Sequence, residues 1–321
     1  MHAHAQPPER ARSKHAAAAW PDFAADVDAI LRLKRERDAV ILAHNYQTPE
    51  IFHGVADIVG DSLVLAREAA KVEARVIVLG GVYFMAETAK LLNPEKTVLI
   101  ADPEAGCSLA SSISGADVRA LRRRHPGVPV VSYVNTSAEV KAESDICCTS
   151  GNAVRVVESL GAKRVLLLPD AYLAKNVAAH TSVEVLAWNG RCEVHEQFDA
   201  EDVRRFREGF PELTVLAHPE CPPEVVEAAD FAGSTAAMSD YVASKRPSLV
   251  MLLTECSMGD NLKLQFPEVE FVGLCRLCPH MQKTTLPGIR RALETLHHEV
   301  LIDPAVAAPA RAAIERMLEV R

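Results

Sequence analysis

A short apolar run followed by a polar cluster recurs three times along the chain. The segments AVILAHNYQTPE (39–50), VPVVSYVNTSAE (128–139) and LTVLAHPECPPE (213–224) each contain such a run, then polar residues, then a turn that ends in glutamate. A short apolar run bounded by turn residues is typical of a buried strand. We therefore interpret the three segments as the starts of three copies of one structural unit.

Each start is followed by a helical pattern with small residues at its head. These segments are GDSLVLAREAAKVEA, TSGNAVRVVESLGAK and GSTAAMSDYVASKRP. In the first, apolar residues recur at helical spacing between Val59 and Ala70, so Ser62 falls in the opening turn of a helix. We expect Ser150 and Ser234 at the same place in the other copies.

Two further apolar runs complete each copy, and a cysteine follows the last run. The first of these runs are ARVIVLGG, KRVLLLPD and PSLVMLLT, and the second are TVLIADPEAGC, VEVLAWNGRC and VEFVGLCRLC. Cys107, Cys192 and Cys278 lie 45, 42 and 44 residues after the serine of their own copy, and 85 and 86 residues from one another. One cysteine therefore falls just beyond the carboxyl end of a strand in each copy.

Alternating strands and helices predict an α/β fold made of three homologous α/β/α sandwich domains with parallel sheets. Ligands of such sheets bind outside the carboxyl ends of the strands. If the domains surround a pseudo-threefold axis, the three strand ends face one central active site. The expected boundaries are a flexible N-terminal tail (1–25), domains at 26–125, 126–211 and 212–295, and a C-terminal helical segment that packs back on the body (296–321).

Composition and charge exclude several classes of function. The 321 residues carry a net charge of −8, which gives no basic field for nucleic acid. The longest apolar runs are too short to cross a bilayer, and the N-terminus lacks the apolar stretch of a secretory signal. Eight cysteines without an export signal indicate a reducing compartment. We expect a cytoplasmic protein with no membrane and no nucleic-acid partner.

Three converging thiolates suit two kinds of metal site. They can bind zinc together with a fourth ligand, or a [4Fe-4S] cluster that keeps one iron free of protein ligands. Structural zinc usually takes ligands close together in the sequence, whereas these lie on separate units. A cluster with an open iron suits a Lewis acid that removes a substrate oxygen. The alternative is that three buried apolar cysteines stand at strand ends by chance.

The remaining cysteines lie outside this pattern. They are Cys147, Cys148, Cys221, Cys256 and Cys275. The adjacent pair points to opposite sides of an extended chain, and Cys221 and Cys256 have no partner at metal-ligand spacing. We expect Cys275 to be a buried thiol. A second hypothesis is a reversible disulfide between Cys275 and Cys278 that forms when the cluster is lost.

Polar residues follow the first strand of each copy and stand at the helix starts. They are His44, Asn45 and Tyr46; Tyr133 and Asn135; His218 and Glu220; and Ser62, Ser150, Ser234 and Thr235. Helix amino termini around one cavity bind carboxylates or phosphate. The histidines can add charge-assisted hydrogen bonds, and Glu220 or a tyrosine can move protons.

Several long motifs resemble those of the quinolinate synthase family. They are AHNYQ, GDSL, GCSLA, SYVNTSAEVKAESDICCTS, WNGRCEVHE, HPEC, GST and CPHM, and the resemblance runs from about residue 27 to 300. It implies three homologous domains around a central [4Fe-4S] cluster. It also implies condensation of iminoaspartate (iminosuccinate) with dihydroxyacetone phosphate, with loss of phosphate and two waters, to give quinolinate, the pyridine precursor of NAD.

The resemblance also implies roles for individual residues. The cluster ligands are Cys107, Cys192 and Cys278, and the open iron binds a substrate oxygen and assists dehydration. The substrate contacts are His44, Ser62, Tyr133, Asn135, Ser150, His218, Glu220 and Thr235, and the proton-transfer groups are Tyr46 and Glu220, assisted by Tyr133. Gly151 replaces the second serine of the family pattern C-C-T-S-S-N-A. Domain movement is expected near Met85 or Asn176, and L-aspartate oxidase is expected as the source of iminoaspartate.

Two other functions remain open from the sequence. One is a hydro-lyase that uses the same open-iron chemistry on a different hydroxy acid. The other is a small-ligand binding protein in which the three thiolates hold zinc.

Overall fold

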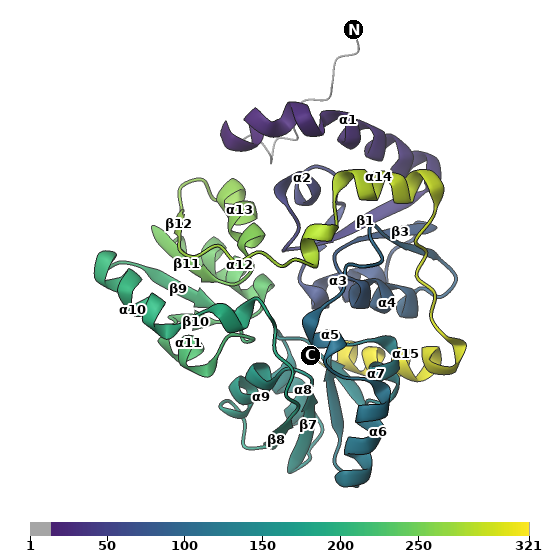
Figure 1. Ribbon diagram of the computed structural model, residues 1–321, viewed down its shortest axis with the longest axis vertical. Coiled ribbons are helices and arrows are strands. Elements are labelled where there is room, and N and C mark those ends of the chain that lie inside the picture. Colours follow the sequence, from purple (N-terminus) through teal and green to yellow (C-terminus); the bar gives the residue numbers. More distant parts are fainter. Residues whose placement is uncertain (1–13, 321) are drawn as a thin grey trace.

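Three four-stranded parallel sheets form the body of the computed structural model, which describes residues 14–320 (Figure 1). The strand orders are β2-β1-β3-β4, β6-β5-β7-β8 and β10-β9-β11-β12, so the three sheets share one topology. This confirms the predicted α/β class with three repeated parallel sheets. We call strands β1–β4, β5–β8 and β9–β12, with their helices, the first, second and third units.

The strands are short. They are β1 (Ala39–His44), β2 (Ile58–Gly60), β3 (Val76–Gly80), β4 (Thr97–Ile100), β5 (Val130–Tyr133), β6 (Ile146–Cys148), β7 (Arg164–Leu168), β8 (Glu184–Ala187), β9 (Thr214–Ala217), β10 (Phe231–Ala232), β11 (Leu249–Leu253) and β12 (Glu270–Val272). The sequence pattern predicted three strands in each unit and missed the second, β2, β6 and β10. These have only two or three residues, too few for an apolar run to be recognised.

Helices connect the strands, because parallel strands need a crossover between them. They are α1 (Lys14–Arg37), α2 (Pro49–Phe52), α3 (Ser62–Ala69), α4 (Tyr83–Leu92), α5 (Ser108–Ser111), α6 (Gly115–Arg124), α7 (Ala138–Ala142), α8 (Ala153–Ser159), α9 (Ala171–Ala178), η2 (His195–Gln197), α10 (Ala200–Gly209), α11 (Pro223–Ala228), α12 (Thr235–Lys245), α13 (Cys256–Gln265), η3 (Met281–Lys283), α14 (Leu286–Thr295) and α15 (Pro304–Glu319).

The central strands are buried on both faces. In the first unit Leu42 and Ile77 belong to one hydrophobic cluster, whereas Ile41 and Val78 belong to another. Successive residues of a strand point to opposite sides of the sheet, so both clusters draw on the same two strands. Helices cover both faces, and for that reason the sequence shows continuous apolar runs and not alternation.

The chain ends differ from the expected division. Helix α1 begins at Lys14, so the expected flexible tail at 1–25 is helical from residue 14. Residues 1–13 lie outside the described part. Helix α14, assigned above to the third domain, packs on α1, β3 and β4 of the first unit.

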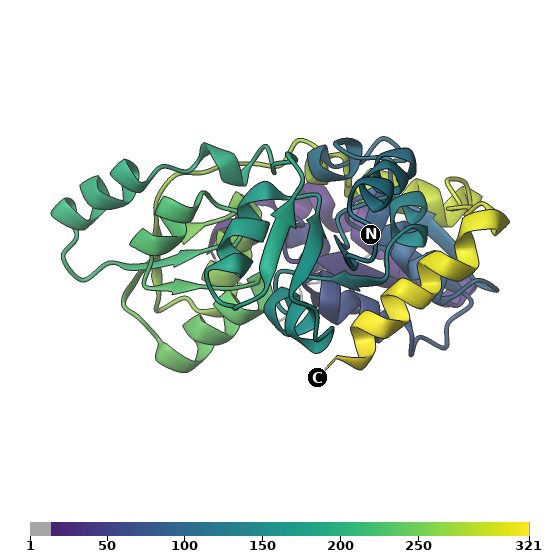
Figure 2. The same ribbon diagram turned by 90° about the horizontal axis from the view of Figure 1, so that it is seen from below.

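The C-terminal helix joins two units. Helix α15, the long yellow helix of Figure 2, packs against α4 of the first unit and against α7 and β6 of the second. Within residues 14–320, no helix combines the length and apolar character needed to cross a bilayer.

Candidate active site

One cavity with an empty volume of about 720 Å³ lies where the carboxyl ends of the three sheets meet. It is lined by all twelve residues that the sequence proposed for the site: Cys107, Cys192 and Cys278 as metal ligands, and His44, Tyr46, Ser62, Tyr133, Asn135, Ser150, His218, Glu220 and Thr235 as binding or proton-transfer groups. The residues come from all three units. The fold therefore brings into one space what the sequence spreads over more than two hundred positions.

Glu220 is the centre of a buried hydrogen-bond network. The Tyr133 hydroxyl donates to its Oε1 at 2.6 Å, and the Asn135 amide donates to the same oxygen at 3.3 Å. Nδ1 of His195 lies 2.8 Å from the other oxygen, Oε2. The second unit therefore supplies three side chains to one carboxylate of the third unit.

These partners decide the charge of Glu220. Burial by itself raises the pKa of a carboxyl group, but the attraction of His218 and His195 when these rings carry a proton, together with the hydrogen bonds from His195 and Tyr133, outweighs burial here. The pKa of Glu220 is consequently held below its usual range. Burial and the nearby Glu220 carboxylate raise the pKa of Tyr133 well above its usual value. The pair therefore consists of an ionised carboxylate and a phenol that keeps its proton.

Two histidines sit in the same local turn in different units. The Tyr46 backbone N–H donates to Nδ1 of His44, and the Glu220 backbone N–H donates to Nδ1 of His218. Each turn follows the first strand of its unit, β1 or β9. In a neutral imidazole this leaves the proton on Nε2, which in His218 lies 3.1 Å from Oγ of Ser150.

Burial lowers the pKa values of both rings. The pKa of His44 falls to about 4, opposed only in part by Asp61 and Glu220, and the pKa of His218 falls to about 3. Both imidazoles are therefore neutral near pH 7. As neutral rings they can offer uncharged N–H donors, in contrast to the charge-assisted hydrogen bonds predicted from the sequence.

The other catalytic candidate, Tyr46, faces the second unit. Its ring packs edge-on against His44 at 4.6 Å, and its hydroxyl contacts Oγ1 of Thr254 and lies 3.4 Å from Nε2 of His195. Burial and the Glu220 carboxylate raise the pKa of Tyr46 well above its usual value. The phenol keeps its proton.

The predicted helix-start residues occupy different positions in the three units. Ser62 opens α3, whose cap is Asp61, and Ser234 caps α12 with Thr235 next to it. Ser150 instead lies two residues before the cap of α8, so its equivalence to Ser62 was wrong in detail. All three places still border the central space.

Gly151 faces the third unit. A Cβ atom at this position would lie 3.2 Å from Oγ of Ser234. A serine here, as in the family pattern, would therefore crowd Ser234 in this arrangement.

The three repeat cysteines share one local geometry. Each is partly buried at the cavity and carries a free thiol. In each case the backbone N–H groups of residues that follow shortly in the chain lower the pKa of the thiol and so favour the thiolate: those of Leu109 and Ala110 for Cys107, of Val194 and His195 for Cys192, and of His280 and Met281 for Cys278. Hydrogen bonds to sulfur are one of the means by which proteins stabilise cluster thiolates.

The donor set therefore fits an iron-sulfur cluster held by three cysteines. Burial raises the pKa of the Cys107 thiol to about 12 and raises the pKa values of Cys192 and Cys278, so in the metal-free state the thiols keep their protons. Metal binding releases such protons, because the thiolate is the ligand.

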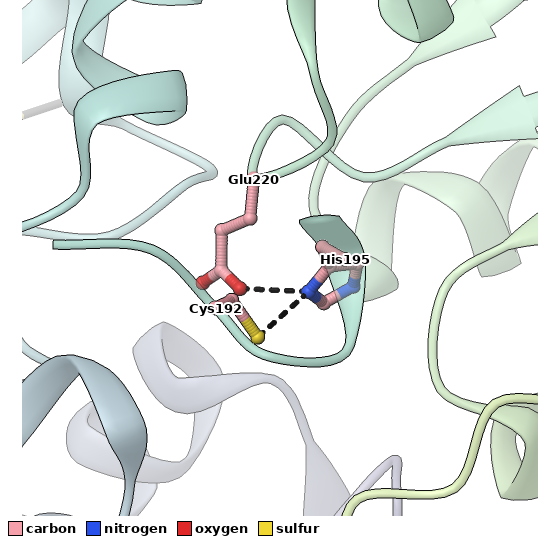
Figure 3. A group of neighbouring side chains, drawn as sticks. All are labelled: Cys192, His195 and Glu220. Carbon is pink, nitrogen blue, oxygen red and sulfur yellow. Dashed lines mark hydrogen bonds and ion pairs between the residues drawn. The ribbon is translucent and has the colours of Figure 1, made fainter. Parts of the chain in front are cut away.

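A second donor set overlaps with the first. Cys192, His195 and Glu220 place one donor atom each within 4.8 Å of one another, and Figure 3 shows both contacts meeting at Nδ1 of His195. This nitrogen lies 3.2 Å from the Cys192 sulfur. Sulfur, imidazole and carboxylate are also donors that zinc accepts.

Cys275 is neither a free thiol nor paired with Cys278. It forms a disulfide with Cys256, across a Cα–Cα distance of 5.0 Å. The physical reason is tertiary: Cys256 opens α13, and its N–H donates to the carbonyl of Arg276, so the segment before Cys278 runs along the start of this helix. The expectation of a buried thiol at Cys275 was wrong. Cys147, Cys148 and Cys221 are buried free thiols.

The two regions in which the sequence predicted movement contain Met85 and Asn176. Met85 lines the cavity from α4. Asn176 lies in α9 and donates to the carbonyls of Pro219 and Cys221, which holds the loop that carries Glu220.

Sequence reasoning missed His195, Thr254 and Glu255. His195 and Glu255 line the cavity, and burial raises the pKa of Glu255 to about 7. The signal for His195 was its place three residues after Cys192, within the motif WNGRCEVHE. Thr254 had no local signal, since it simply follows a buried strand.

Comparisons with known proteins identify the family of the chain. The model of the family described as Quinolinate synthetase A protein matches residues 28–319. Proteins named quinolinate synthase include one from Agrobacterium fabrum, 69% identical over 94% of this chain and 88% of its own, and one from Caulobacter vibrioides, 58% identical over 94% and 83%. Quinolinate synthase 1 of Mesorhizobium japonicum is 70% identical over 93% and 92%. The chain belongs to the quinolinate synthetase A protein family, a family of enzymes.

Proposed function

We propose that this protein condenses iminoaspartate with dihydroxyacetone phosphate to form quinolinate, with loss of phosphate and two waters, in NAD biosynthesis. The observation that carries the proposal is the buried network around Glu220 at a cavity bordered by three free cysteines from three units. The names of the relatives support the same reaction.

Cys107, Cys192 and Cys278 would hold a [4Fe-4S] cluster. Three protein ligands leave one iron open, and when bound the cluster supplies a Lewis acid that polarises a substrate oxygen during dehydration. The backbone N–H groups after each cysteine, which favour the thiolate at all three positions, support this assignment.

Neutral hydrogen-bond donors at the edge of the cavity would bind the anionic substrates. The Nε2–H groups of His44 and His218 and the hydroxyls of Ser62, Ser150 and Thr235 can donate to carboxylate or phosphate oxygens. The amino ends of α3 and α12 add unpaired backbone N–H groups and a partial positive charge. A dianion that displaces water here also favours protonation of the two imidazoles, because opposite charge raises a histidine pKa.

Proton transfer falls to Glu220 and the two tyrosines. Condensation needs a base to remove a proton from carbon, and the ionised Glu220 carboxylate is such a base. Each loss of water needs an acid to protonate the leaving hydroxyl, and Tyr133 and Tyr46 keep their protons for that step. The hydrogen bond between Tyr133 and Glu220 allows the proton taken by one to be returned through the other.

The chemistry of iminoaspartate indicates that the preceding reaction is an oxidation. Iminoaspartate hydrolyses in water and must arise from oxidation of aspartate, so functional coupling to an L-aspartate oxidase is part of the proposal. A cavity enclosed by three units protects the imine from water. A cytoplasmic location remains a prediction of the sequence.

An anaerobic assay tests the function. Cluster-loaded protein is supplied with enzymatically generated iminoaspartate and dihydroxyacetone phosphate, and quinolinate is measured. We expect product from the parent chain and none when either substrate is omitted. Absence of quinolinate with protein that contains about four irons per chain would overturn the proposal.

A zinc-bound small-molecule binding protein is the second candidate, and the set of Cys192, His195 and Glu220 favours it. Metal analysis after anaerobic purification separates the two. About four irons with broad absorption near 400 nm supports the enzyme, whereas a colourless protein with one zinc supports the binding protein.

A further inference from the structure

Thr254 occupies a junction between all three units. It follows β11 at the carboxyl edge of the third sheet, and only 1% of its surface is exposed. Its hydroxyl contacts the Tyr46 hydroxyl of the first unit and lies 3.0 Å from Nε2 of His195 of the second. Thr254 itself does not line the cavity, whereas both of its partners do. Any effect on the reaction must therefore pass through Tyr46 and His195.

Glu220, at the end of the chain of contacts from Tyr46 through Thr254 and His195, determines which group donates in each hydrogen bond. The ionised Glu220 carboxylate can only accept, and Nδ1 of His195 lies 2.8 Å from it, so Nδ1 carries a proton. When Nδ1 carries the only ring proton, Nε2 is an acceptor. The single hydroxyl proton of Thr254 satisfies it, which leaves the Thr254 oxygen to accept from Tyr46.

The chain of donors therefore runs from Tyr46 to Thr254 to His195 to Glu220. Within it, the Tyr46 hydroxyl donates to Thr254, which holds the Tyr46 oxygen at a fixed place beside the cavity until its proton is transferred to a bound molecule. Tyr133 donates to the other oxygen of Glu220, so both tyrosine hydroxyls are tied into one buried network. Such networks hold side chains in one arrangement when every member has a partner.

We propose that Thr254 is a positioning residue, whose hydroxyl fixes the orientation of the Tyr46 hydroxyl and the tautomer of His195. The inference rests on the proposed function, since it takes Tyr46 to act in that reaction. Without this hydroxyl, Nε2 of His195 loses its donor and the Tyr46 hydroxyl loses its acceptor. Both groups then adopt several orientations, of which only some are productive.

Steady-state kinetics of Thr254→Val and Thr254→Ser test the proposal. Valine keeps the shape and removes the hydroxyl, so we expect kcat to fall about 10- to 100-fold while KM changes by less than about 3-fold. Serine keeps the hydroxyl and should restore kcat to within about 3-fold. The control Thr88→Val removes a buried hydroxyl that bonds only within α4, and should leave kcat unchanged. Equal losses in the valine and serine variants would contradict the proposal.

A double-mutant cycle separates positioning from a loss of structure. If Thr254 acts through Tyr46, Thr254→Val should cost much less in a Tyr46→Phe background than in the parent, because the phenylalanine has no hydroxyl to orient. The same fold-change in both backgrounds would overturn the inference. Thr254→Ala gives the same comparison if the valine variant is unstable.

A measurement that needs no turnover keeps the inference distinct from the proposed function. The chain has five tyrosines, so labelling with ring-¹³C tyrosine gives a small set of NMR signals, and Tyr46→Phe identifies that of Tyr46. In the anaerobic holoprotein, Thr254→Val should shift this signal and Thr254→Ser should not. An unchanged Tyr46 signal in the valine variant rejects the positioning role, even if the parent makes quinolinate. If the parent protein makes no quinolinate but the Tyr46 signal still shifts in Thr254→Val, only the proposed function is rejected.

Discussion

The hydroxyl of Tyr133 donates a 2.6 Å hydrogen bond to Oε1 of Glu220, across the boundary between the second and third units. Both side chains are buried, and each alters the pKa of the other: Glu220 helps to raise the pKa of Tyr133, and the hydrogen bond helps to lower that of Glu220. The phenol of this pair belongs to the second unit and the carboxylate to the third. The predictions below follow from this joint site.

Removing either member of the pair should slow the reaction. Glu220→Gln keeps the shape but not the base, and Tyr133→Phe removes the acid, so we expect kcat to fall by about 10²- to 10⁴-fold in each. Anaerobic steady-state assays measure it, with the exposed Glu158→Gln as the matched control. Activity within 3-fold of the parent in Glu220→Gln would remove this residue from the proposed proton transfer.

The cysteines divide into ligands and bystanders. Alanine at Cys107, Cys192 or Cys278 should abolish retention of iron, because a cluster with two protein ligands is not held. Alanine at Cys147, Cys148 or Cys221 should leave about four irons per chain. Iron and sulfide analysis with the absorption near 400 nm measures this. Full iron content in Cys278→Ala would show that the third ligand lies elsewhere.

Acid should destabilise the fold through His44. The unfolded chain protonates this residue below its ordinary pKa of 6.5, whereas the folded chain does so only below about 4. The unfolded state therefore binds more protons between these values, and stability falls as pH falls from 6.5 to 4. At about 1.4 kcal/mol per unit, the loss reaches about 3 kcal/mol.

Denaturant titrations of the cluster-free chain at several pH values measure this dependence. His44→Asn removes the titrating group and keeps an acceptor in place of Nδ1, so it should flatten the slope. An unchanged slope in this variant would assign the acid sensitivity to other groups.

Lys141 is a buried lysine that we expect to stabilise the fold. It is fully buried in α7, donates to the carbonyl of Thr136 and lies 5.6 Å from the ring centroid of Phe84. Burial lowers its pKa, and the nearby Glu87 opposes that shift. Lys141→Met should leave Glu87 without its compensating charge and lower the free energy of unfolding by about 3 kcal/mol or more.

Thermal and denaturant unfolding measure the Lys141 effect. The exposed Lys71→Met makes the same chemical change on the surface and should alter stability by less than about 0.5 kcal/mol. Equal effects of the two substitutions would show that the buried charge has no special role.

The disulfide between Cys256 and Cys275 should affect stability and not the cluster. It closes a loop with a sequence separation of 19, so removal by Cys275→Ser should cost about 3 kcal/mol under oxidising conditions. A reductant should produce the same loss in the parent and none in the variant. Iron loss in Cys275→Ser would instead make this residue part of the cluster site.

Much of the molecule was determined by local sequence patterns. Among residues 14–320, the apolar runs located nine of the twelve strands, since buried parallel strands are continuously apolar. The repeat spacing predicted three units with one cysteine each. The positions of His44 and Tyr133 at strand ends followed directly, because ligand-binding residues of parallel sheets gather at the carboxyl edge. The start of α3 at Ser62 was also local, set by the cap Asp61.

Tertiary structure alone decided which groups meet. His195 reaches Glu220, Thr254 reaches Tyr46, and Cys256 pairs with Cys275, although nothing near these residues in the sequence indicates the partner. The placement of α14 on the first unit was also decided by tertiary structure. The apolar face of a helix can pack on any complementary apolar surface, so the sequence of α14 does not indicate which unit it covers. Secondary structure depends on neighbours along the chain, whereas the direction of a proton, the charge of a carboxylate and the pairing of two thiols depend on neighbours in space.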